Sequence, residues 1–174
     1  MVATKSSPLL IAFGANIEPL VNLHKGLTLL HDSLGVVAIS TVYRTAPLGE
    51  IPQPDYLNGA LLCQAQLPYQ QLKPLLREIE NQCGRVRGGH PYAPRPLDLD
   101  IAMMGETVLS TPPLPDPDIL ERPFLLHALA QLAPDLNHPL LHTTLAQLAA
   151  TLHPEAPPLV VDREATRTLQ GILL

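Results

Sequence analysis

Two aspartates alternate with leucines in residues 95–101, which read RPLDLDI. Side chains of a strand point alternately to its two faces, so Asp98 and Asp100 share a face if this segment is a strand, with Cβ atoms about 7 Å apart. Carboxylates at that spacing can flank two metal ions about 3.5–4 Å apart, and Mg²⁺ prefers such oxygen ligands together with substrate phosphates. The alternative is a solvent-facing polar edge of a half-buried strand, although adjacent like charges destabilise a protein unless a cation offsets them.

Arginines gather ahead of this aspartate pair, in a Gly- and Pro-rich loop at residues 85–96. Arg85, Arg87 and Arg95 lie on this loop, on a chain whose formal net charge is −5. Guanidinium groups keep their charge and match phosphate oxygens, so such a loop beside a metal site can position phosphoryl groups and neutralise developing charge. Surface arginines on a flexible loop are the alternative. The chain contains neither the P-loop pattern nor the Gly-x-Gly-x-x-Gly pattern, so neither of those phosphate cradles is indicated.

Tyr56 and Asn58 follow a loop rich in proline and stand two residues apart, so on a strand they would face the same way. The ring could stack on a flat heterocycle while the amide reads its edge. A packed tyrosine and a turn asparagine explain these two residues as well.

The elements that must position these residues follow the order strand, helix, strand, strand, helix, strand. We expect them at residues 9–13, 19–34, 36–45, 56–67, 68–83 and 97–104, with Pro74 causing a kink or a later start of the second helix. This order predicts an α+β fold with a ferredoxin-like βαββαβ core and a mainly antiparallel sheet.

The rest of the chain is expected to add extra C-terminal helices to one domain spanning residues 1–174. A short strand is predicted at 108–109 and helices at 124–132 and 145–152. The core would cover about 8–135, and residues 136–174 would form a helix and a tail. The proline-rich stretch after His153 predicts a surface tail.

Composition excludes several classes of protein. Hydrophobic residues make up 46% and charged residues 16%, which suits a folded core, and the acidic balance argues against a nucleic-acid surface. Cys63 and Cys83 lack metal or redox spacing, as in a reduced cytoplasmic protein, and no run nears the roughly 20 apolar residues that span a bilayer. The seven histidines are scattered and are interpreted as surface or packing residues. We expect a monomer.

From Ile11 to about Pro134 the sequence resembles 6-hydroxymethyl-7,8-dihydropterin pyrophosphokinase, a family of folate biosynthesis. The matching segments are FGAN at 13–16, YRTAPLG at 43–49, QPDYLN at 53–58, Glu80 with GRVR at 84–87, PRPLDLDI at 94–101 and ERPFLL at 121–126. The combination of the Tyr-x-Asn and Arg-x-x-Asp-x-Asp segments is highly specific. The resemblance implies transfer of the β,γ-diphosphate of ATP to the pterin hydroxymethyl group, which gives AMP.

The resemblance also implies roles for individual residues. Asp98 and Asp100 would hold two Mg²⁺ ions, and Arg85 and Arg95 would lie on a mobile catalytic loop and engage the phosphates. The remaining assignments divide between two substrates: Tyr56, Phe124, Asn58, Thr45 and Leu48 for the pterin, and Glu80, Arg87, Ile101 and Arg122 for ATP.

The chain departs from the family pattern at four positions. Asp116 stands where many members carry a histidine that contacts ATP, Gly88 where some carry lysine, Tyr92 where some carry tryptophan, and Ala15 where serine is common. Two rival functions share this element order. A non-catalytic small-molecule-binding module does not need both the aspartate pair and three loop arginines, and an RNA-binding domain places aromatic residues on its central strands.

Overall fold

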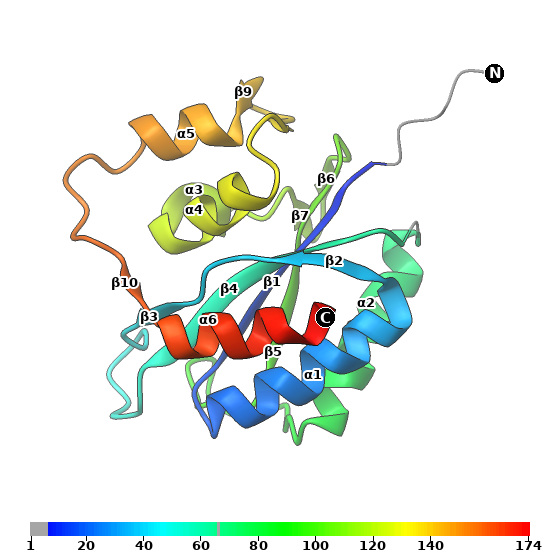
Figure 1. Ribbon diagram of the computed structural model, residues 1–174, viewed down its shortest axis with the longest axis vertical. Coiled ribbons are helices and arrows are strands. Elements are labelled where there is room, and N and C mark those ends of the chain that lie inside the picture. Colours follow the sequence, from blue (N-terminus) through cyan, green and yellow to red (C-terminus); the bar gives the residue numbers. More distant parts are fainter. Residues whose placement is uncertain (1–6, 66) are drawn as a thin grey trace.

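One sheet with helices on both faces forms the centre of the molecule (Figure 1). The computed structural model describes residues 7–65 and 67–174. In chain order its elements are β1 (Leu9–Ala15), α1 (Pro19–Leu34), β2 (Val36–Ile39), β3 (Tyr43–Thr45), β4 (Tyr56–Cys63), α2 (Tyr69–Gln82), β5 (Asp98–Met104), β6 (Leu109–Ser110), β7 (Pro113–Leu114), α3 (Asp118–Glu121), α4 (Pro123–Leu132), β8 (Asn137–His138), β9 (Thr143–Thr144), α5 (Leu145–Thr151), β10 (Val160–Val161), α6 (Arg163–Gln170) and the 3₁₀ helix η1 (Gly171–Leu173).

Strand order confirms the predicted α+β class and its antiparallel sheet. The main sheet runs β10-β3-β4-β1-β5, with β2 also paired to β4, and each of these pairings is antiparallel. Helix α1 connects β1 to β2 and β3, yet β4 lies between β1 and these two strands. This is the split βαβ arrangement that the order of elements predicted, and it makes β1 a central strand with β4 and β5 on its two sides.

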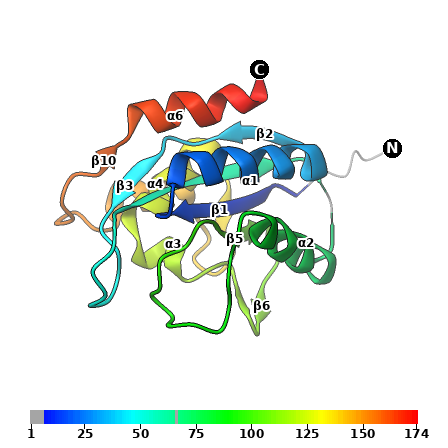
Figure 2. The same cartoon turned by 90° about the horizontal axis from the view of Figure 1, so that it is seen from below.

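Each face of the sheet has its own hydrophobic core. Figure 2 shows α1, α2 and α6 in front of one face, where Leu23 and Leu27 of α1 pack against Ile11 of β1. Helices α3, α4 and α5 cover part of the other face, with a core that includes Leu10 and Leu129. Because both faces are covered, alternate residues along β1 are buried in opposite directions.

The predicted helices are confirmed to within two residues at each end, and α2 begins at Tyr69 with Pro74 inside it. Two strand predictions need correction. The strand predicted at 36–45 breaks because the Ser40 Oγ accepts the Ala60 N–H at 2.9 Å in place of a backbone carbonyl. The strand predicted at 56–67 ends at Cys63, and Gln66 lies outside the described residues.

The surface tail predicted after His153 agrees with residues 154–158, which are mostly exposed and outside helices and strands, but not with residues 160–173. Strand β10 pairs with β3, and the Asp162 side chain caps α6 by accepting the Ala165 N–H at 2.9 Å. Leu169 of α6 has 0% of its surface exposed and joins the α1 core.

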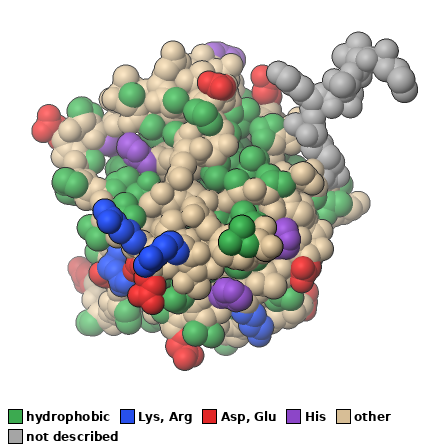
Figure 3. Space-filling view, viewed as in Figure 1, with side chains coloured by type: hydrophobic (Ala, Val, Ile, Leu, Met, Phe, Trp, Pro, Cys, Tyr) green, Lys and Arg blue, Asp and Glu red, His purple; other side chains and the backbone are tan. Residues whose placement is uncertain are grey.

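On the face in Figure 3, basic and acidic side chains lie side by side near the start of α6. In the part of the chain that the structure describes, no helix combines the length and apolar character needed to cross a bilayer.

Candidate active site

A glycine separates two polar side chains on one face of the sheet. Gly14 of β1 pairs with Asn58 of β4 on one side and with Asp98 of β5 on the other, so the three residues form a row across the strands. A Cβ atom at Gly14 would stand 2.5 Å from Oδ1 of Asn58. The glycine therefore keeps open the space between the amide and the carboxylate.

This row borders a cavity of about 610 Å³, a size typical of small-molecule sites. The predicted site residues that line it are Thr45, Leu48, Tyr56, Asn58, Arg95, Asp98, Asp100 and Arg122. Six residues for which the sequence predicted no role in the site also line the cavity: Ala46, Gln53, Pro91, Tyr92, Asp118 and Glu121. Five other predicted site residues do not line this cavity: Glu80, Arg85, Arg87, Ile101 and Phe124.

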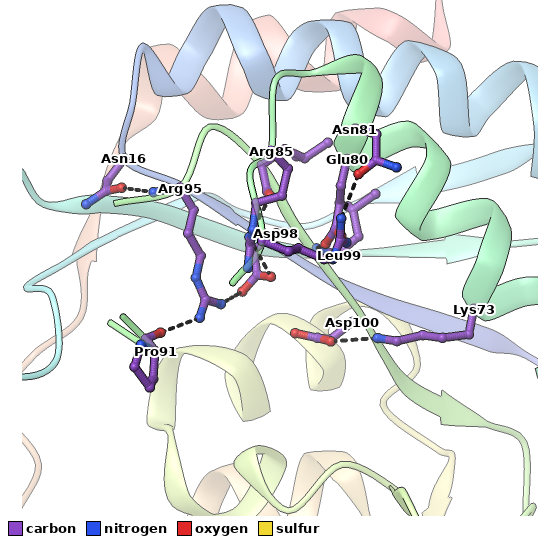
Figure 4. Close-up of polar contacts among 12 residues, drawn as sticks. Asn16, Lys73, Glu80, Asn81, Arg85, Pro91, Arg95, Asp98, Leu99 and Asp100 are labelled. Atoms are coloured by element: carbon purple, nitrogen blue, oxygen red, sulfur yellow. Dashed lines mark hydrogen bonds and ion pairs between the residues drawn. The ribbon is translucent and has the colours of Figure 1, made fainter. Parts of the chain in front are cut away.

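Asp98 is bracketed by two arginines of the loop before β5 (Figure 4). Arg95 donates to Oδ2 of Asp98 at 2.5 Å and to the Pro91 carbonyl at 2.6 Å. Arg85 donates to Oδ1 of Asp98 at 3.1 Å and to the Leu97 carbonyl at 2.9 Å. Both predicted catalytic arginines therefore contact a predicted metal ligand, although only Arg95 faces the cavity.

Asp100 has a different partner, Lys73 of α2, whose ammonium lies 3.1 Å from its Oδ1. Desolvation in the concave site raises the pKa of Asp100, although 48% of its side-chain surface still meets solvent. The charge of Asp98 raises that pKa further, while Lys73 and Arg95 oppose the shift. Sequence reasoning missed Lys73 because only the packing of α2 beside β5 brings it to the aspartate.

Glu80 fixes the strand between the two aspartates. Its side chain is buried, and Oε1 accepts the backbone N–H of Leu99 at 2.8 Å. The other carboxylate oxygen pairs with Arg87, which also donates to Oδ1 of Asn81 at 2.7 Å. Burial raises the pKa of Glu80, and the Leu99 N–H opposes that shift. Ile101 points to the α1 and α2 core and is 6% exposed.

Asn58, Thr45 and Tyr56, three of the residues predicted for the pterin, lie at the opposite end of the row from Asp98. The Asn58 amide nitrogen donates to Oγ1 of Thr45 at 2.6 Å, so the amide oxygen of Asn58 stays available to a ligand. Tyr56 is half-buried, which raises its pKa, and Leu48 is 50% exposed. Phe124 lies beneath Arg122, whose guanidinium carbon is 5.2 Å from the ring centroid.

Asn16 ties together the two loops that border the cavity. Its side chain donates to Oε1 of Gln53 at 2.7 Å and to the Pro54 carbonyl at 3.0 Å, and it accepts the Arg95 N–H at 2.8 Å. Gln53 in turn donates to the Tyr92 carbonyl at 2.6 Å. Asn16 and Gln53 stand in the sequence segments FGAN and QPDYLN, but their role depends on contacts between segments far apart in the chain.

The carboxylates present fit Mg²⁺. Among the described residues no three His, Cys, Asp or Glu side chains converge as a complete protein metal site. Mg²⁺ commonly takes one or two carboxylates and completes its shell with water and substrate phosphates. Asp98 and Asp100 share the cavity lining and each already pairs with a cationic side chain, so both positions accept positive charge.

The model of the 7,8-dihydro-6-hydroxymethylpterin-pyrophosphokinase (HPPK) family matches residues 10–134, a stretch that contains every predicted site residue. The chain belongs to the HPPK family. A Pseudomonas aeruginosa protein named 2-amino-4-hydroxy-6-hydroxymethyldihydropteridine pyrophosphokinase is 37% identical over 134 residues, which cover 74% of this chain and 82% of that protein. A Synechocystis protein of the same name is 35% identical, with 79% and 72% covered.

A longer relative is also similar to this chain. The Arabidopsis thaliana folate synthesis bifunctional protein is 35% identical over 133 residues, which cover 74% of this chain but only 28% of that protein. The family match confirms the resemblance that the aspartate and tyrosine segments indicated.

Proposed function

We propose that this protein transfers the diphosphate of ATP to the hydroxymethyl group of 6-hydroxymethyl-7,8-dihydropterin in folate biosynthesis. The hydroxymethyl oxygen attacks the β-phosphorus, the bond from that phosphorus to the α,β-bridging oxygen breaks, and AMP leaves with the electron pair. The hydroxyl proton passes to water. In such transfers the protein mainly positions the reactants and stabilises negative charge.

One observation carries this proposal: a single cavity holds an aspartate pair and a tyrosine–amide pair in a chain of the HPPK family. We assign Asp98 and Asp100 to two Mg²⁺ ions, which would neutralise charge on the phosphoryl oxygens. Arg95 and Arg85 would hold those oxygens at the aspartate end. This end of the cavity would therefore receive the phosphates, because its cationic and carboxylate groups converge there.

The remaining assignments follow the resemblance to the family. Tyr56 and Phe124 would stack on the two faces of the pterin, while Asn58, Thr45 and Leu48 read its edge. For ATP we assign Arg122, which lines the cavity, with Arg87, Glu80 and Ile101 beyond the lining. Glu80 and Ile101 are buried, so we expect them to act by shaping the wall of the nucleotide site.

The decisive test is product analysis with purified protein, ATP, Mg²⁺ and the hydroxymethyl pterin. We expect AMP and the pterin diphosphate in equal amounts, and no AMP without pterin. Asp98→Asn should lower kcat by several orders of magnitude because it removes a metal ligand. Asp135→Asn, the same change at an exposed position outside the cavity lining, serves as the control.

Two outcomes would refute the proposal. Formation of ADP would contradict transfer of a diphosphate. Tight binding of both ligands without turnover would instead support a non-catalytic binding module.

We further propose that the protein works as a monomer in the cytoplasm and binds neither nucleic acid nor membrane; sedimentation of the pure protein tests the oligomeric state.

A further inference from the structure

Lys73 is the side chain that balances the charge of Asp100. Its ammonium approaches from α2, on the other side of Asp100 from the arginines that hold Asp98 (Figure 4). Among the described residues, Asp98 has two ionic partners, Arg85 and Arg95, whereas Asp100 has Lys73 alone. The two candidate metal ligands are therefore neutralised by different elements of the fold.

Helix α2 fixes the base of Lys73 but leaves its ammonium able to move. The adjacent Leu72 and the nearby Leu76 are fully buried against the core, so the helix holds the Lys73 Cα in place beside β5. The Lys73 side chain itself is 29% exposed. A lysine ammonium is a point charge on a flexible four-carbon stem, and unlike a guanidinium it makes no fork-shaped contact that must be broken as a unit.

A second carboxylate stands close to this pair. The Asp116 N–H donates to the carbonyl of Ala102 at 2.9 Å, which holds Asp116 beside β5 on the strand that carries Asp100. Burial raises the pKa of Asp116 to about 6; the charges of Asp118 and Asp100 add to that rise, and Lys73 opposes it. Lys73 forms its ion pair with Asp100, and its charge also acts weakly on Asp116.

We propose that Lys73 is a positioning residue that occupies the cation position at Asp100 in the free protein, where a divalent cation must displace it. The proposal rests on the assignment of Asp100 as a metal ligand. A divalent cation carries twice the charge of an ammonium, so the Asp100 carboxylate attracts it more strongly than it attracts Lys73. Binding of the cation breaks the Lys73–Asp100 ion pair, and the free energy of that pair is subtracted from the binding free energy. Lys73 thereby lowers the affinity of the nucleotide-free site for metal.

Direct metal binding tests this without any turnover. Mn²⁺, which also prefers oxygen ligands, is titrated into the full chain while free Mn²⁺ is measured by electron paramagnetic resonance. Lys73→Met should bind Mn²⁺ roughly two- to fivefold more tightly, since a partly exposed ion pair contributes only modestly. Lys73→Arg keeps the charge and should stay near the wild-type affinity. Lys73→Gln is a second neutral variant, and urea unfolding checks that each variant is folded.

The control is Lys25→Met, which removes the same charge from α1. Lys25 donates to the Gln82 carbonyl and has no carboxylate partner among the described residues. Tighter binding in Lys73→Met and Lys73→Gln alone supports the proposal; an unchanged affinity, or an equal change in Lys25→Met, overturns it. If wild-type binding survives in Asp100→Asn, the metal assignment falls as well, whereas binding lost there but unchanged in Lys73→Met refutes only the role of Lys73.

Discussion

Gly14→Ala should weaken pterin binding in the cavity while leaving the stability of the fold nearly unchanged. The added Cβ would stand 2.5 Å from Oδ1 of Asn58, closer than nonbonded atoms tolerate. Asn58 is 9% exposed and its amide is held by Thr45 at 2.6 Å, so it can give way only by rotating and losing that hydrogen bond. The methyl group would then fill the space between the amide and Asp98.

The opposing effects on stability nearly cancel. Loss of the Asn58–Thr45 hydrogen bond costs about 0.5–1.5 kcal/mol. Replacing a strand glycine by alanine returns about 0.5–1 kcal/mol, because Gly14 does not have the positive φ that would forbid it. We expect the melting temperature to change by no more than about 4 °C. Pterin binding should instead weaken by about 1–3 kcal/mol, because the displaced amide no longer pairs with the ring edge.

Titration calorimetry with the pterin, in the presence of Mg²⁺ and a non-hydrolysable ATP analogue, measures this loss. Gly171→Ala is the matched control, since no atom beyond its chain neighbours and its own helix backbone lies within 4 Å of the Cβ position there. A Gly14→Ala protein that binds pterin as the wild type does would show that Asn58 does not read the substrate. A large fall in melting temperature would show that the glycine mainly serves packing.

Three further predictions address the nucleotide side, the C-terminal helix and the pterin face. Burial raises the pKa of Asp116 to about 6, so its charge destabilises the fold above that pH and the penalty is relieved as the pH falls toward 3.8. Asp116→Asn should therefore stabilise the protein by about 1–2 kcal/mol at pH 7.5 and by little at pH 4, as urea unfolding will show; equal gains at both pH values would contradict this. Leu169→Ala should cost about 2–5 kcal/mol in the same assay, whereas Leu174→Ala, at an exposed site, should cost almost nothing. Phe124→Ala should weaken pterin binding by about 1–3 kcal/mol in calorimetry and leave ATP binding nearly unchanged, and an unaltered pterin affinity would remove this ring from the site.

Local sequence patterns were enough to predict the order of elements in the fold. The leucines of α1 repeat at helical spacing and Gly35 ends the helix with a φ of 63°. The alternation of Asp98 and Asp100 with leucines correctly places both aspartates on the cavity side of β5. These features depend on neighbours within a few residues, which is the range over which periodicity carries information.

Features that depend on pairing between distant segments could not be predicted. The position of Gly14 between Asn58 and Asp98 requires the register of three strands. The contact of Lys73 with Asp100 requires the packing of α2 on β5. Helix α6 was missed because it contributes only two residues, Ala165 and Leu169, to the core, so its eight residues show too narrow an apolar stripe.

The ion pairs of the free site explain how it could receive a strongly anionic ligand without leaving buried charges unpaired. Asp98 and Asp100 together carry two negative charges, and Arg85, Arg95 and Lys73 bring three positive ones. An unpaired charge in a recessed site is costly, so each aspartate needs a partner before any metal arrives. A cation bound at Asp98 would take over that carboxylate, and Arg85 and Arg95 would then be available to phosphate oxygens at the same end of the cavity. The arginines would thus pair first with Asp98 and then with the phosphate oxygens. For this reason we expect Arg95→Ala to change both the affinity for metal and kcat.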